Sequence, residues 1–163
     1  MYLPDLPLPE DFMDVKLVIQ KELIPIDLCL TANRFCMPFK KLNRNDFLNE
    51  NEQERLMVRT PNGKRVERIR VLFIEPNGDR NAEGIVFKKW VRPKMYVLIG
   101  QWHRVCEKHK LEVGTIVRVY SFRFKEGELG FAMAVVGKGE NGNGNSKGKG
   151  TELAFARVGS GSV

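Results

Sequence analysis

Short apolar segments rich in β-branched and aromatic residues recur along most of the chain, separated by polar turns. Segments of this length and composition are typical of strands rather than of long helices. Pro-Asn-Gly at 61–63, Pro-Asn-Gly at 76–78 and Lys-Glu-Gly-Glu at 125–128 predict turns between neighbouring strands. The predicted strands are residues 16–24, 34–38, 55–60, 65–75, 84–90, 95–99, 115–124 and 129–136.

Two stretches instead show a helical pattern. Residues 43–56 are strongly polar, with Phe47 and Leu48 as the packing residues. Residues 100–114 place one apolar stripe at offsets of three, four and seven, and Gly114 offers a stop. The members of this stripe are Trp102, Val105, Cys106 and His109. Many short strands with two short helices predict a mainly β domain, a barrel or pseudobarrel.

The two ends of the chain differ in composition from the middle. Residues 1–17 form a proline-rich, acidic N-terminal arm, and residues 138–163 form a Gly/Asn/Lys-rich tail with too few apolar residues for a packed core. The folded domain is therefore predicted to span residues 18–137. Residues 1–14 and 139–163 are expected to be dispensable for folding.

The distribution of charge points to an anionic partner. The chain has a net charge of +7, and residues 20–136 alone carry +8. A basic folded part favours nucleic acid, although a basic but inert surface would look the same. No apolar run is long enough to span a bilayer, and the N-terminus lacks a signal-peptide pattern. Three cysteines give no paired disulfide framework, which suggests a reducing, intracellular setting.

Candidate catalytic and metal chemistry is sparse. His103, Cys106 and His109 have a metal-like spacing, but the two histidines lie about 240° apart around a helix. No fourth ligand is evident, so core packing is the favoured interpretation of these residues. Nucleophile-elbow, P-loop and dinucleotide motifs do not occur. The sequence predicts no enzyme, no cofactor and no small-molecule substrate.

Several motifs in order resemble the plant B3 DNA-binding domain. They are "KELIPID", "NRFCMP", "KKW" followed by "YVLIGQW", and "LEVGTIVRVYSFR". The resemblance covers most of residues 20–136. The wording "MPFKKLNRNDFL" and "YSFR" is most similar to a divergent branch of B3 domain-containing proteins. Trp90, Tyr96 and Trp102 are expected to pack within the fold rather than to read a ligand.

The resemblance implies a seven-stranded open β-barrel with two short helices and two arms that grip the major groove. The N-arm would be Leu30 to Arg34, and the C-arm Val91 to Met95. Lys40 and Lys41 would begin the first helix beside phosphates, and Arg92 would read a base. The DNA-binding residues implied in this way are Thr31, Asn33, Arg34, Lys40, Lys41, Lys89, Arg92 and Lys94. Each role has an alternative that stays open. Arg34 could form an internal ion pair with Asp27 instead, and Lys40 and Lys41 could be a solvated helix start.

Departures from the family pattern lie where base reading would occur. The chain has "LTAN" without the usual preceding lysine, Arg92-Pro93-Lys94 in the C-arm, and Thr115 in place of an Asp. The predicted function is sequence-specific binding of double-stranded DNA by a nuclear regulator of plant transcription, with protein partners as a further class. The alternative is a protein-interaction module of the same fold with weak or non-specific DNA binding.

Overall fold

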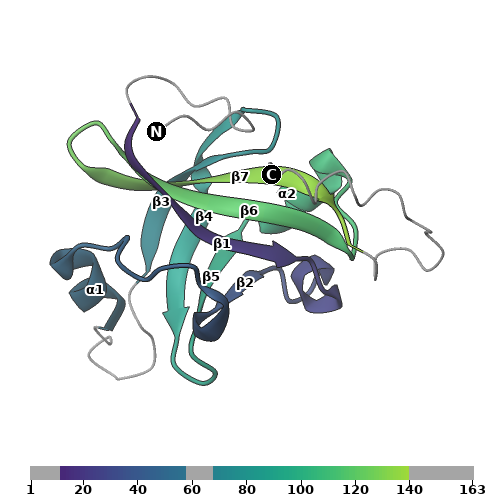
Figure 1. Ribbon diagram of the computed structural model, residues 1–163, viewed down its shortest axis with the longest axis horizontal. Helices are drawn as coiled ribbons and strands as arrows, with labels where there is room; N and C mark the ends of the chain where they lie inside the picture. The colour runs from purple at the N-terminus through teal and green to yellow at the C-terminus, as the bar shows by residue number, and fades with distance from the viewer. Residues whose placement is uncertain (1–11, 58–67, 140–163) are drawn as a thin grey trace.

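The protein folds around one seven-stranded sheet that curls into an open barrel (Figure 1). The structure, a computed structural model, describes residues 12–57 and 68–139. The strand order is β1-β6-β7-β3-β4-β5-β2, with β1 and β2 at the two ends, so the sheet does not close on itself. The predicted fold, a mainly β open barrel of seven strands, is confirmed. The strands are β1 Met13–Glu22, β2 Phe35–Pro38, β3 Ile69–Ile74, β4 Arg80–Trp90, β5 Met95–Gly100, β6 Thr115–Phe124 and β7 Glu128–Lys138.

Most strand pairs are antiparallel, and three of these pairs, β3–β4, β4–β5 and β6–β7, are joined by short turns. β6 and β7 pair over their whole length from Thr115↔Lys138 to Phe124↔Glu128. The one parallel pair joins β3 to β7 through Leu72↔Gly130, Phe73↔Phe131 and Ile74↔Ala132. Gly130 of β7 has no room for a side chain, because an added Cβ would lie 2.5 Å from the Phe122 ring.

Two short α-helices, α1 Glu50–Met57 and α2 Trp102–His109, and two 3-10 turns, η1 Pro25–Leu28 and η2 Phe39–Lys41, complete the described fold. The two predicted helices are present but shorter. α2 ends at His109 because Lys110 turns left-handed (φ 51°), and Gly114 belongs to the turn before β6. None of the helices within the described ranges is long and apolar enough to cross a membrane.

The segment 43–49 was predicted as the first half of a helix and is instead irregular, with several bends. Its backbone groups are satisfied from outside: Asn43 N–H donates to the Val18 carbonyl at 2.7 Å, and Lys16 Nζ donates to the Asp46 carbonyl at 3.0 Å. Phe47 inserts into the barrel and contacts Tyr96 and Phe131 at ring distances of 5.6 and 6.0 Å. The predicted strand 55–60 is also wrong for residues 55–57, which end α1, while 58–60 lie outside the described residues.

The barrel interior holds the main core. It is built from the inward positions of every strand and is closed by Trp102 and Val105 of α2. Trp102 and Tyr96 are buried, as predicted, whereas Trp90 is only half-buried and lies on the outer face of β4. Examples of fully buried members are Ile19, Phe35, Phe73, Phe87, Leu98 and Phe131.

A second apolar cluster lies on the outer face of β1, β6, β7 and β3. It includes Phe12, which precedes β1 and stacks on Phe122 with ring centroids 4.2 Å apart. β1 itself begins at Met13, so the predicted boundary between residues 17 and 18 falls inside a strand. The expectation that residues 1–14 are dispensable is wrong for Phe12 to Asp14, because this end of β1 pairs with β6 and Phe12 is buried.

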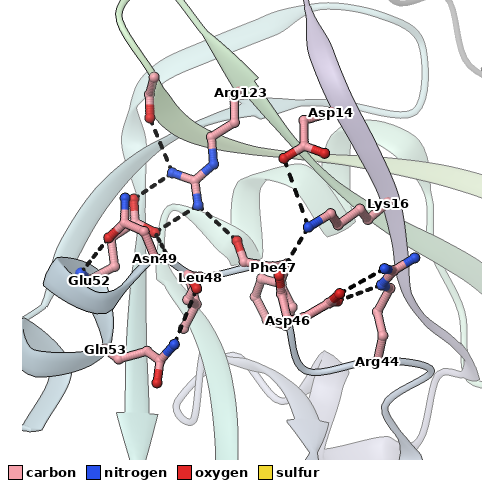
Figure 2. A network of polar contacts seen from close by, with 11 residues as sticks. Asp14, Lys16, Arg44, Asp46, Phe47, Leu48, Asn49, Glu52, Gln53 and Arg123 are labelled. Carbon is pink, nitrogen blue, oxygen red and sulfur yellow. Dashed lines mark hydrogen bonds and ion pairs between the residues drawn. The ribbon is translucent and has the colours of Figure 1, made fainter.

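An ion pair fixes α1 and the irregular segment before it to the sheet (Figure 2). The guanidinium of Arg123 on β6 binds both carboxylate oxygens of Glu52, at 2.6 and 2.8 Å, and also donates to the Phe47 carbonyl at 2.8 Å. Glu52 is at the same time part of a capping box: its side chain accepts from Asn49 N–H, and Asn49 Oδ1 accepts from Glu52 N–H. One carboxylate therefore both starts the helix and anchors it.

We expect Glu52→Gln to lower the free energy of unfolding by about 3 kcal/mol, because it leaves the largely buried Arg123 guanidinium without its counter-charge. Glu54→Gln changes an exposed carboxylate of the same helix and is the matched control, expected to stay within about 0.5 kcal/mol of the parent. Chemical unfolding of both variants makes the comparison. Equal effects of the two substitutions would show that the ion pair does not anchor α1.

Candidate nucleic-acid interface

The outer face of β4, β5 and β2 carries basic and aromatic side chains at one end of the barrel. Side chains alternate along a strand, so the residues next to the buried Phe35, Tyr96 and Phe87 on the same strands point to the outer face. The register pairs Cys36 and Lys88 with Val97, and Pro38 and Trp90 with Met95. We call this surface the arm face; its half-buried residues are Arg34, Lys88, Trp90 and Met95, while Cys36 and Val97 on the same side of the strands are buried.

Arg34 is held on the arm face by stacking. Its guanidinium carbon lies 4.5 Å from the centroid of the Trp90 ring, a cation–π geometry. Its Nε atom is buried and has no hydrogen-bond partner among the described residues. The guanidinium also contacts the thiol of Cys36: burial raises the pKa of that thiol, and the hydrogen bond with Arg34 opposes the rise. Stacking on Trp90 therefore orients the side chain, with its Nε enclosed by the fold.

The alternative in which Arg34 pairs with Asp27 is wrong. Asp27 is fully buried and pairs with Lys21, whose Nζ lies 2.9 Å from Asp27 Oδ2. Its carboxylate also accepts hydrogen bonds from the backbone N–H of Ile24 and of Cys36. These contacts anchor both ends of the loop that carries the N-arm, so Arg34 is left free to stack on Trp90.

Asn33 lies in the N-arm but is used inside the fold. It adopts a left-handed conformation (φ 49°), which Asn tolerates better than most residues. Its Nδ2 donates to the Gly100 carbonyl at 2.5 Å, and its Oδ1 accepts from His103 N–H at 2.9 Å. The side chain thus caps the start of α2 from another segment. A DNA contact through Asn33 stays a prediction, and the structure shows its two amide atoms already paired.

Thr31 and Leu30 are the exposed residues at the turn of the N-arm. The Thr31 hydroxyl lies 3.2 Å from the Cys29 sulfur. That hydrogen bond is the main cause that lowers the pKa of the Cys29 thiol, and hydrogen bonds with the backbone of Ala32 and Thr31 lower it further. The hydroxyl and the apolar Leu30 side chain are accessible to a ligand that approaches the arm face.

The C-arm and the η2 turn lie together. The C-arm forms the β4–β5 turn, which projects from the lower end of the sheet in Figure 1, and Arg92, Pro93 and Lys94 are exposed on it. Phe39 N–H donates to the Lys94 carbonyl at 3.2 Å, which places η2 beside this turn. Lys40 and Lys41 belong to η2 and are exposed. The prediction that they begin the first α-helix is wrong, but the structure does bring them next to the C-arm.

Lys89 lies on the other face of β4 from Arg34 and Trp90. Its Nζ is 3.2 Å from the Met57 sulfur and 5.6 Å from the Phe39 ring centroid, so it covers the lower rim of the core. Its neighbour Lys88 points to the arm face. The alternation of buried Ile85 and Phe87 along β4 was the signal in the sequence that could have selected Lys88 instead.

The metal-like trio of His103, Cys106 and His109 is used for packing and polar contacts. Cys106 is buried, and burial raises the pKa of its thiol to about 12. His109 Nε2 lies 2.9 Å from Glu75 Oε1. Burial alone would raise the pKa of Glu75, but hydrogen bonds with His109, Lys108 and Asn81 lower it. Within the described residues, no group of three or more His, Cys, Asp or Glu side chains is arranged to hold a metal ion.

Comparison with known proteins agrees with this architecture. A family profile described as "B3 domain-containing protein At2g31720-like" matches residues 8–136. The chain belongs to the B3-domain family.

Relatives in Arabidopsis thaliana cover most of the chain. Putative B3 domain-containing protein At3g24850 is 33% identical over 128 residues, 74% of this chain and 34% of the relative. B3 domain-containing protein At2g31420 is 30% identical over 128 residues, 77% of this chain and 60% of the relative. B3 domain-containing protein At3g25182 is 33% identical over 129 residues, 74% of this chain and 36% of the relative. The chain thus spans between about a third and three fifths of the length of these relatives.

We expect Asn33→Gly to lower the free energy of unfolding by about 1–3 kcal/mol. Glycine keeps the left-handed backbone conformation, so the loss comes from the unpaired Gly100 carbonyl and His103 N–H. Thr31→Ala, in the same loop, is the control and should melt like the parent chain. Thermal unfolding measures both, and an unchanged melting temperature for Asn33→Gly would rule out the capping role.

Proposed function

We propose that this B3 domain binds double-stranded DNA in a sequence-dependent way through the arm face, with the N-arm and the C-arm on either side. The observation that carries the proposal is Arg34, whose guanidinium is held over the Trp90 ring beside the two arms. An arginine held in one orientation loses little side-chain entropy on binding and can present two parallel donors to guanine.

The charge around the arm face supports a nucleic-acid ligand. Lys40, Lys41, Arg92 and Lys94 are exposed beside one another, and no ion pair between any of them and an acid occurs among the described residues. Unpaired lysines and arginines at the rim suit the phosphate backbone, which supplies most of the non-specific affinity. These charged side chains would position the duplex through its phosphates, and the arm residues would then read its bases.

The wider role follows the family as a proposal: a regulator of transcription in the plant nucleus. Each arm also exposes one apolar side chain. Leu30 of the N-arm has 63% of its surface accessible, and Val91 of the C-arm has 43%. Apolar contacts with the thymine methyl group would complement guanine reading by arginine. A further proposal is that the protein also binds protein partners.

Lys40→Ala is expected to weaken binding to every duplex alike and to flatten the plot of log affinity against log salt by about one unit. The reason is that Lys40 would neutralise one phosphate without touching a base. Lys108→Ala is the matched control, because the Lys108 ammonium is already paired with Glu75 and Asp79. Fluorescence anisotropy across a salt series measures both slopes, and identical slopes for Lys40→Ala and the parent would remove Lys40 from the interface.

Arg34→Ala and Arg92→Ala should each cost about 1–3 kcal/mol on a duplex selected from a random library and less on a scrambled one. Trp90→Leu keeps every charge but removes the ring that orients Arg34, so it should reduce selectivity while leaving the salt slope unchanged. Competition binding against both duplexes provides the measurement. If all three variants kept the parent's affinity and selectivity, the protein-interaction function would replace DNA reading for this face.

A further inference from the structure

A hollow of about 680 Å³ lies where β3 and β7 separate, and we call it the β3 hollow. Its walls come from α1 and from the β6–β7 turn, which lie one below the other at the left of Figure 1. Ligand pockets of proteins commonly span about 300–1,000 Å³, so the β3 hollow is large enough for a bound molecule. It shares no residue with the arm face or with the two arms.

One side of the β3 hollow is the backbone edge of β3. Residues 69–72 line it consecutively, although Ile69 and Val71 point into the core and Arg70 is exposed. Residues of opposite faces border the same hollow when it runs along the edge of their strand. β7 pairs with β3 only from Leu72↔Gly130 onward. Residues 69–71 therefore pair with β4 on one side and with no described residue on the other.

Arg123 holds the two walls of the β3 hollow in place. Its guanidinium binds Glu52 of α1 at 2.6 and 2.8 Å (Figure 2). It also donates to the Gly127 carbonyl of the β6–β7 turn at 3.1 Å. The hollow is thus formed before a ligand arrives, which lowers the ordering cost of binding.

The charges around the β3 hollow favour an acidic ligand. Its cations are Arg55, Arg70, Arg80 and Lys125. Arg80 and Lys125 are exposed, and their charged groups lie 5.0 and 5.8 Å from the ring centroids of Phe12 and Phe124. Of the three acids that line the hollow, Glu52 is neutralised by Arg123. Glu126 and Glu128 of the turn then stand against four cations, so positive charge is in excess.

We propose that an extended acidic peptide of a partner protein binds in the β3 hollow as a strand added to the open edge of β3. The peptide backbone pairs with residues 69–71, and its Asp or Glu side chains meet Arg70, Arg80 and Lys125. A strand edge offers carbonyl acceptors as well as N–H donors, and a peptide uses both, whereas phosphates use donors alone. The inference rests on the protein partner proposed above and is independent of DNA reading by the arm face.

Hydrogen exchange of the free chain tests the open edge first. Within residues 69–71, the amide N–H groups that do not pair with β4 should exchange at least about tenfold faster than the paired N–H groups of residues 72–74. Equal protection of the two sets would show that another part of the chain already occupies the edge, and it would overturn the proposal.

Binding is tested with two libraries of short blocked peptides in the full chain's presence. In the first, glutamate alternates with Val, Ile, Leu or Phe, and in the second lysine replaces glutamate. Alternation places all charges on one side of an extended peptide. We expect enrichment from the glutamate library alone. Enrichment from neither library, or from the lysine library, would overturn the acidic peptide.

Three variants and two modified peptides locate the bound peptide. Arg80→Gln and Lys125→Gln should each weaken the selected peptide by about threefold to fivefold. Arg104→Gln removes the same charge from an exposed site on α2 outside the hollow and is the matched control. N-methylation on odd or on even residues keeps the charge, and only one of the two versions should lose binding, because alternate N–H groups face β3. Equal weakening by all three variants, or equal binding of both methylated peptides, would overturn strand addition.

Competition with a duplex separates this site from DNA reading. A duplex selected by the chain should leave the peptide bound, and Arg34→Ala should keep the parent's affinity for the peptide. Displacement of the peptide by the duplex, with a loss of duplex affinity in Arg80→Gln, would assign the β3 hollow to phosphates and overturn the peptide. The exchange and peptide measurements need no DNA, so a failure of DNA reading by the arm face would leave their outcome unchanged.

Discussion

The buried pair of Lys21 and Asp27 is the interaction on which the candidate interface depends. Asp27 is fully buried, and burying a carboxylate is costly unless its charge and its lone pairs are satisfied. Here Lys21 of β1 supplies the charge at 2.9 Å, and the N–H groups of Ile24 and Cys36 supply hydrogen bonds. The backbone carbonyl of Asp27 accepts a further bond from Trp102 Nε1 at 2.7 Å. One residue therefore connects β1, η1, β2 and α2.

That connection explains why the N-arm has a defined position. The loop between η1 and β2 is held by Asp27 at its start and by Asn33, bound to Gly100 and His103, at its end. Arg34 follows directly and stacks on Trp90 at the end of β4. The C-arm begins at Val91, the residue that follows the end of β4, so the stacked pair links the two arms. A surface prepared in this way pays little ordering cost when a ligand binds.

The sequence predicted the strands well because their signals are local. β6 was predicted with its observed bounds, and the turns at 76–78 and 125–128 were found from residue types alone. The irregular segment 43–49 was missed because its polar residues are helix-compatible, while its conformation is decided by distant groups on β1 and β6. Tertiary contacts override local preference in such cases.

The site was harder to predict than the fold for the same reason. Arg34, Lys40, Arg92 and Lys94 were selected from the resemblance, and the structure places them around one face. The opposite directions of Lys88 and Lys89 could have been read from the alternation along β4, whereas the internal pairing of Asn33 depends on the position of α2. The sequence left a pairing of Asp27 with Arg34 open as an alternative, and it did not indicate Lys21 as the partner, since a charge pair between separate segments leaves no trace in sequence spacing.

Residue-resolved amide shifts on titration with a selected duplex test the central claim most directly. The arm face predicts that the perturbed amides cluster in residues 29–41 and 88–95, while those of β6, β7 and α1 stay unchanged. The duplex would then lie across β2, β4 and β5 with one arm on each side. Perturbations centred on β6, β7 or α1, or none at a duplex concentration that saturates binding in solution, would contradict the assignment of this face to DNA.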